Sequence, residues 1–65
     1  MLDTLEKLIE LEKEGYKYNG TSGFRYLIGG TLQFYVKLVQ NGDEIELRFD
    51  NQEEIKVKQY LDIPS

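Results

Sequence analysis

The sequence predicts an α+β fold, in which an N-terminal amphipathic helix packs on one face of an antiparallel β-meander of four strands. A fifth strand is added if residues 16–18 also pair with the sheet. Three observations indicate this fold: apolar residues recur with a helical period near the N-terminus, they alternate in the middle of the chain, and Gly29-Gly30 and Asn41-Gly42 interrupt that alternation. A chain of 65 residues is short, and we expect one domain over residues 1–65.

The first predicted element is an amphipathic helix that ends at Gly15. Its apolar stripe consists of Leu2, Leu5, Leu8 and Ile9. Asp3 and Glu6 match a capping box at the start of the helix, and Gly15 stands where a left-handed residue ends a helix. In that type of ending we expect Leu11 to contact Tyr16 across the cap.

Two glycine-containing dipeptides predict two-residue hairpin turns. With a turn at Gly29-Gly30, the expected opposite pairs are Leu27 with Leu32, Tyr26 with Gln33, Arg25 with Phe34 and Phe24 with Tyr35. With a turn at Asn41-Gly42, the expected pairs are Leu38 with Ile45, Lys37 with Glu46, Val36 with Leu47, Tyr35 with Arg48 and Phe34 with Phe49. The second set alternates apolar pairs with a charge pair and a Tyr–Arg pair, which supports its register.

A third hairpin is predicted through residues 51–53. Only an odd-numbered loop leaves Ile55 and Val57 on the core side of the sheet, because side chains alternate between its faces. The last strand is expected to run to about Leu61, and Pro64 marks the end of regular structure. The predicted sheet core then comprises Leu27, Leu32, Phe34, Val36, Leu38, Ile45, Leu47, Phe49, Ile55, Val57 and Leu61.

The opposite face of the predicted sheet carries a cluster of aromatic and aliphatic residues on its earlier strands. The candidate partner-binding residues are Phe24, Tyr26, Ile28, Tyr35 and Val39, together with Arg48. Contiguous apolar patches commonly mark interfaces, and Tyr and Arg are frequent in binding hot spots. Alternatively, residues 16–23 fold over this surface and cover it.

Acidic residues outnumber basic ones by twelve to eight, which gives a net charge of −4. This sign opposes binding to a phosphate backbone, so we expect no direct contact with nucleic acid. Residues 43–54 hold six acidic residues against Arg48 alone, and the candidate acidic patch is Asp43, Glu44, Glu46 and Asp50. Such a patch suits a basic partner, although solvated strands and turns of acidic proteins have the same composition.

Catalytic and metal-binding chemistry finds little support in the composition. The chain contains neither Cys nor His, which excludes disulfides, thiolate catalysis, His-based triads and the usual zinc sites. Asp43-Glu44 and Glu53-Glu54 match no calcium loop. We therefore expect no enzymatic activity, no catalytic residues, no metal and no cofactor. Residues 19–23 are interpreted as a polar loop.

The sequence thus favours a small acidic protein-binding or inhibitor module that acts through its aromatic sheet surface, on a protein partner or on itself as a homodimer. The absence of Ala and the abundance of Leu, Ile, Lys, Glu, Tyr and Asn are typical of AT-rich coding, as in a low-GC bacterium or its phage, which suggests an accessory protein that blocks a host enzyme. Two alternatives remain: an oligomer that sequesters a small anionic, nucleotide-like ligand beside Lys17, Arg25 and residues 19–23, and an acidic nucleic-acid mimic. No leader or membrane span is recognised, and a cytoplasmic location is expected.

Overall fold

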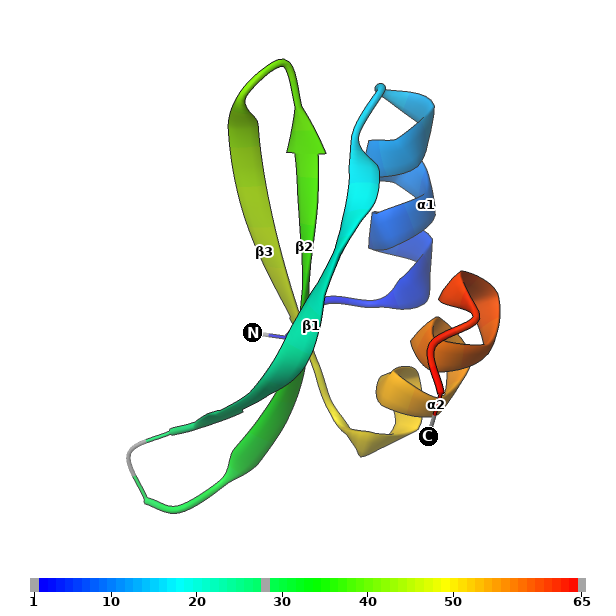
Figure 1. Ribbon diagram of the computed structural model, residues 1–65. Coiled ribbons are helices and arrows are strands. Elements are labelled where there is room, and N and C mark those ends of the chain that lie inside the picture. The colour runs from blue at the N-terminus through cyan, green and yellow to red at the C-terminus, as the bar shows by residue number, and fades with distance from the viewer. Residues whose placement is uncertain (1, 28, 65) are drawn as a thin grey trace.

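The computed structural model describes residues 2–27 and 29–64, which form two helices and one sheet (Figure 1). The elements in chain order are α1 (Leu5–Lys13), β1 (Lys17–Tyr26), β2 (Leu32–Gln40), β3 (Asp43–Phe49) and α2 (Asn51–Leu61). The strands form an antiparallel meander in the order β1-β2-β3, and both helices lie on the same side of it. The predicted α+β meander with an N-terminal helix is confirmed, whereas the predicted fourth and fifth strands were wrong, because the described sheet has three strands.

Helix α1 ends where the sequence predicts, but its N-cap lies one residue later than predicted. The Thr4 side chain, rather than that of Asp3, caps the helix by accepting from the Lys7 N–H at 3.2 Å. At the other end Gly15 has a φ of 109°, and the Tyr16 N–H donates to the Leu11 carbonyl at 3.0 Å. This is a Schellman ending, in which Leu11 and Tyr16 both join the core.

The β2–β3 hairpin has the predicted register. Asn41 and Gly42 take positive φ values of 49° and 88°, as a type I′ turn requires. The structure pairs Phe34 with Phe49, Tyr35 with Arg48, Val36 with Leu47, Lys37 with Glu46 and Leu38 with Ile45, as expected. Alternation along these strands turns Phe34, Val36 and Leu38 toward the helices and places Tyr35, Lys37 and Val39 on the opposite face, here called the open face.

The β1–β2 hairpin differs from its prediction by one residue. Phe24 lies opposite Phe34 instead of Tyr35, and the hairpin is closed by the Leu27 N–H, which donates to the Thr31 carbonyl at 2.8 Å. A shift of one residue exchanges the two faces of a strand. The predicted register would have turned Arg25 toward the core, whereas the observed one places it on the open face, where it pairs with Glu46.

Residues 19–23 do not form the predicted loop, since they continue β1. The pairing changes between Tyr18, opposite Leu38, and Ser22, opposite Val36, so two extra residues on β1 form a bulge. Within it the Thr21 N–H donates to Asn19 Oδ1 at 2.9 Å. Residues 17–23 therefore lie in β1 at the edge of the sheet and Tyr16 packs against the core, so this segment does not fold over the aromatic residues of the sheet.

The segment expected to be the last strand is helix α2. The Asp50 carboxylate caps this helix by accepting from the Glu53 N–H at 2.8 Å, and Glu54 and Lys58, one turn apart, form an ion pair at 2.9 Å. Helical geometry separates the two residues that a strand would have placed together. Val57 is completely buried against the sheet, whereas Ile55 is 62% exposed, so its assignment to the core was wrong.

The core lies between the sheet and the two helices. Its buried members are Leu8, Leu11, Phe34, Val36, Leu38, Leu47, Phe49 and Val57. Neither helix in the described part of the chain is long and apolar enough to cross a membrane. The far end of the β1–β2 hairpin extends beyond both helices (Figure 1), and this end, residues 24–27 and 31–33, is called the arm.

Candidate functional site

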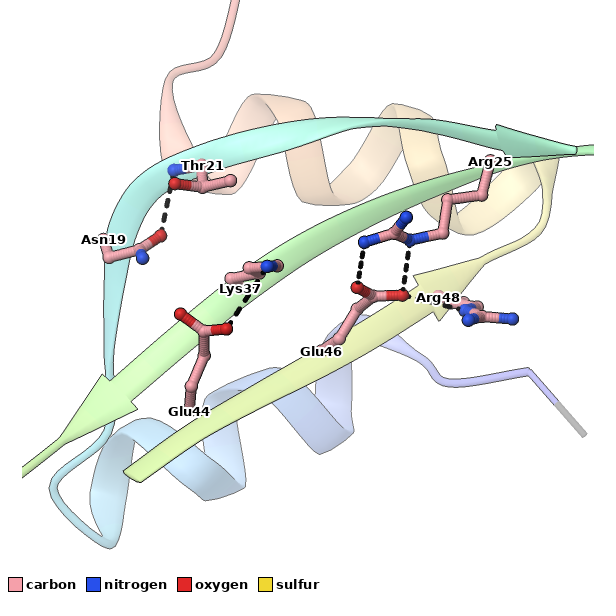
Figure 2. A network of polar contacts seen from close by, with 7 residues as sticks. All are labelled: Asn19, Thr21, Arg25, Lys37, Glu44, Glu46 and Arg48. Carbon is pink, nitrogen blue, oxygen red and sulfur yellow. Dashed lines mark hydrogen bonds and ion pairs between the residues drawn. The ribbon is translucent and has the colours of Figure 1, made fainter. Parts of the chain in front are cut away.

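A network of ion pairs occupies the open face of the sheet (Figure 2). The Arg25 guanidinium binds the Glu46 carboxylate through two hydrogen bonds, from Nε at 2.9 Å and from Nη2 at 2.7 Å. Arg48 Nε donates to the same carboxylate at 3.0 Å, and Lys37 Nζ lies 3.2 Å from Glu44 Oε1. Glu46 on β3 thus binds both Arg25 on β1, at the opposite edge of the sheet, and Arg48 on its own strand.

These contacts alter the electrostatics of the predicted acidic patch. The hydrogen bond from Arg25, helped by Arg48, lowers the pKa of Glu46, and the same hydrogen bond raises the pKa of Arg25. Glu44 is paired with Lys37, and the Asp50 carboxylate caps α2. Three of the four predicted members are therefore engaged within the protein, and Asp43 lies at the β2–β3 turn. The structure does not assemble the four into an uncompensated acidic surface.

The open face is in fact basic. Its charged side chains on the three strands are Lys17, Arg25, Lys37, Arg48, Glu44 and Glu46, four basic and two acidic, which gives +2. The remaining ten acidic and four basic residues of the chain lie on the helices, in the segments next to them and, for Asp43, at the start of β3, and they give −6. The fold therefore separates charge between the sheet surface and the helical side of the molecule.

The predicted partner-binding residues are divided between the two faces of the sheet. Phe24 and Tyr26 lie on the helix side of the arm, whereas Tyr35, Val39 and Arg48 lie on the open face. Ile28 lies outside the described residues. The structure therefore brings Phe24 and Tyr26 together but does not join them to the other predicted members.

Tyr35 is engaged within the sheet. It lies opposite Gly23, and a Cβ atom added at Gly23 would come within 3.2 Å of the Tyr35 ring, so the ring covers the space that the glycine leaves. The Arg25 guanidinium lies 4.4 Å from the centroid of the same ring. The expected Tyr–cation contact thus exists, but Arg25 makes it rather than Arg48.

The arm presents three large apolar side chains to solvent on one face, and this group is called the arm surface. Phe24 is 49% exposed, Tyr26 78% and Leu32 42%. Tyr26 and Leu32 are directly opposite each other, and Phe24 is opposite Phe34 on the same face. Leu32 was expected in the core, and it is exposed because the helices do not cover the outer end of the arm.

The inner edge of the arm surface is held by the core. The Phe24 and Phe34 rings meet edge to face with centroids 5.5 Å apart, and Phe34 continues to Phe49 at 6.4 Å. Lys58 of α2 places its ammonium 5.3 Å from the centroid of Phe24 and 5.1 Å from that of Phe34. Phe24 therefore has one side fixed by packing and the other open to solvent.

A groove lies next to Lys58, which borders the arm surface. An open groove of about 480 Å³ runs along α2 and the C-terminal residues, and its lining includes Ile55, Lys58 and Ile63. Lys58 belongs both to this groove and to the border of Phe24. Lys58 thus lies between the arm surface and the groove that holds exposed Ile55.

The outer edge of β1 is available for pairing, because β2 is its neighbour on one side and no described strand lies on the other. The opposite edge of the sheet is partly occupied. There the Asp3 N–H donates to the Arg48 carbonyl at 2.8 Å, and the Arg48 N–H donates to Asp3 Oδ2 at 3.1 Å. The two edges of the sheet therefore differ in accessibility.

Sequence reasoning missed Leu32 and Lys58 as members of this surface. A signal for Lys58 was present, because Asp50 and Glu53 have the spacing of a helix N-terminus, and Glu54 and Lys58 the spacing of a helical ion pair. No comparable signal marks Leu32, whose exposure depends on where the helices end.

Groups of three or more potential metal ligands of the Asp, Glu, His or Cys type do not occur among the described residues. No protein-family model, curated protein or solved structure matches the chain.

Proposed function

We propose that this chain is a non-enzymatic protein-binding module whose contact with its partner centres on the arm surface, Phe24, Tyr26 and Leu32. The observation that carries the proposal is the exposure of these three neighbouring side chains on a projecting hairpin. Tyr and Phe are rich sources of contact area, and a partner that covers them gains the free energy of apolar burial.

The attachment of Phe24 to the core supports this role. Its ring is already positioned by Phe34 and by the Lys58 ammonium before any partner arrives. A side chain that is ordered in advance loses less conformational entropy on binding. Phe24 thus has the properties of an anchor, and Tyr26 and Leu32 provide additional area around it.

The two alternatives from the sequence receive less support. Nucleic-acid mimicry needs carboxylates free to meet a basic groove, yet Glu44 and Glu46 are each paired with basic side chains. The anion-sequestering hypothesis used residues 19–23 as a binding loop, and these residues form the bulge of β1. Action on a host enzyme, a phage or low-GC bacterial source and the absence of catalysis stay predictions.

The test compares binding by variants that alter the arm surface and a matched control. Tyr26→Glu combined with Leu32→Glu adds charge to the arm, and Ile55→Glu makes the same kind of change at an exposed apolar residue of α2. Proteins captured by the wild-type chain should be captured by Ile55→Glu and lost by the arm variant, with mass spectrometry identifying them. Far-UV circular dichroism checks that each variant is folded.

The proposal fails if the folded arm variant captures the same proteins in the same amounts as the wild-type chain. Sedimentation of the purified wild-type protein separates binding to other proteins from self-association. Dimerisation that the arm variant abolishes would make a second copy of the chain the partner.

A further inference from the structure

The outer edge of β1 combines free backbone groups with apolar side chains on the helix side and basic side chains on the open face. We propose that this edge binds an extended segment of a partner protein as an added antiparallel or parallel strand, and that the segment alternates acidic and apolar residues. The inference rests on the proposed function and specifies the chemistry of its partner. Addition of a strand to an exposed sheet edge is a general mode of peptide recognition.

The hydrogen-bond pattern identifies the free backbone groups. The Leu27 N–H donates to the Thr31 carbonyl, so these two residues form a hydrogen-bonded pair. Because bonded and non-bonded pairs alternate along an antiparallel ladder, the backbone N–H and C=O groups of Arg25 and Gly23 also point toward β2. The N–H and C=O groups of Phe24 and Tyr26 therefore point away from the sheet. The residues with outward backbone groups are thus the same residues whose side chains form the arm surface.

The side chains beside this edge require different residues on the two faces of an incoming strand. On the helix side the strand would meet Phe24 and Tyr26, which favour apolar residues. On the open face it would meet Lys17 and Arg25 of β1 itself, on a face that carries +2. Acidic residues on that face of the segment would complement this charge.

The basic groups are not fully neutralised within the sheet. Arg25 and Arg48 share the single carboxylate of Glu46, which leaves one positive charge in excess. No carboxylate of the described residues lies within 4.0 Å of the Lys17 ammonium. The excess of charge on the open face therefore includes the edge strand.

A second copy of the chain fits this edge less well. Twofold pairing about Phe24 would place the Arg25 side chains of both copies near each other on one face, as diagonal neighbours of like charge. The exposed parts of the arm surface amount to roughly 350 Å², about half of the roughly 800 Å² that each partner contributes to a standard interface. Charge and area thus favour a short acidic segment over a homodimer.

The experiment titrates the ¹⁵N-labelled protein with a capped eight-residue peptide that alternates Glu and Val, and follows amide hydrogen exchange by NMR. Strand addition should slow exchange at Phe24 and Tyr26, by about tenfold at a peptide concentration of ten times Kd. Exchange at Arg25, which already faces β2, should change little. A peptide with Lys in place of Glu is the matched control and should bind more weakly.

Charge variants test the role of the open face. Lys17→Glu should raise the Kd of the Glu-Val peptide about 2- to 5-fold, and added salt should reduce the difference from the wild-type chain. Lys13→Glu, which makes the same change at an exposed residue of α1, should leave Kd unchanged. The two variants have the same net charge, so a difference between their Kd values shows that the position of the charge on the open face matters.

Protection that does not alternate between neighbouring residues, or equal binding of the Glu and Lys peptides, would overturn the proposal. Concentration-dependent protection of Phe24 and Tyr26 without peptide would also overturn it, in favour of self-pairing. If the Glu-Val peptide does not bind while capture of partners still requires Tyr26 and Leu32, strand addition is wrong and the proposed function stands. If the Glu-Val peptide does not bind and capture of partners does not require Tyr26 and Leu32, both strand addition and the proposed function are wrong.

Discussion

Glu53 shows how one side chain can connect elements that are far apart in the sequence. Its Oε1 accepts from the Leu5 N–H at 3.0 Å, and its Oε2 accepts from Lys56 Nζ at 3.2 Å. The Leu5 N–H is among the amides at the start of α1 that have no partner within the helix. A carboxylate in the first turn of α2 therefore supplies an acceptor for the first turn of α1.

These contacts predict a pH dependence of stability. The Leu5 N–H, and then Lys56, lower the pKa of Glu53 in the folded protein. A lowered pKa contributes stability that is present above the pKa of the unfolded chain, about 4.3, and is lost as the pH falls through the folded value. Urea unfolding at pH 7 and pH 3 should therefore show a smaller loss of stability in Glu53→Gln than in the wild-type protein.

Glu10→Gln provides the control, since Glu10 is an exposed glutamate of α1. This variant should follow the wild-type dependence on pH more closely than Glu53→Gln does. Identical acid sensitivity of the wild-type protein and Glu53→Gln would contradict the assigned role of Glu53.

At the scale of the element, the two helices have related endings made by different residues. Helix α1 uses Gly15 at a positive φ, whereas α2 uses Asp62, with φ 58° and ψ 44°. The Ile63 N–H donates to the Lys58 carbonyl at 2.9 Å, which corresponds to the bond between Tyr16 and Leu11 after α1. A side chain in the left-handed region is strained, and a negative charge at a helix C-terminus opposes the helix dipole.

Asp62→Gly should therefore stabilise the protein by about 1 kcal/mol, because glycine takes this conformation without strain and removes the charge. Thermal unfolding should show a midpoint higher by roughly 4–8 °C. Glu14→Gly is the matched control at the C-cap of α1, where φ is −82° and glycine relieves no strain. That variant should be destabilised, and an equal gain in both variants would refute the explanation.

At the scale of the whole molecule, one sheet separates two different environments. Both helices cover the side on which Leu8, Val36, Phe49 and Val57 are buried. The open face holds the basic network, and the arm extends past the helices with its apolar side exposed. The exposed surface exists because the hairpin is longer than the helical layer that covers it.

Two substitutions in α2 test this layered arrangement. In a strand, Ile55 and Val57 would lie on one face and both would contribute to stability, whereas in the helix only Val57 is buried. Val57→Ala should lower the free energy of unfolding by about 1–3 kcal/mol, and Ile55→Ala should change it by less than about 0.5 kcal/mol. Urea unfolding measures both changes. Comparable losses of stability in the two variants would contradict the helix and favour a strand over these residues.

Several features of the fold could be predicted from local sequence. Gly15 predicted the end of α1, and Asn41-Gly42 predicted the turn and the register of β2 with β3, because few residues take a positive φ at low cost. Of the candidate site, the exposure of Phe24 and Tyr26 to solvent was predicted, although the face of the sheet on which they lie was not. The acidic residues were recognised as a group, but their pairing with basic partners was not.

The chain by itself determined where it turns and which residues are apolar enough to form a core. Tertiary packing decided the register of β1 and which of the alternating apolar residues of the last segment is buried. Two glycines at the first bend allow more than one loop length, so the pairing followed from Phe24 packing on Phe34 and Arg25 reaching Glu46. Ile55 and Val57 alternate as in a strand, but the cap at Asp50 and the burial of Val57 between α2 and the sheet favoured a helix, because helical geometry buries one of these residues without the other.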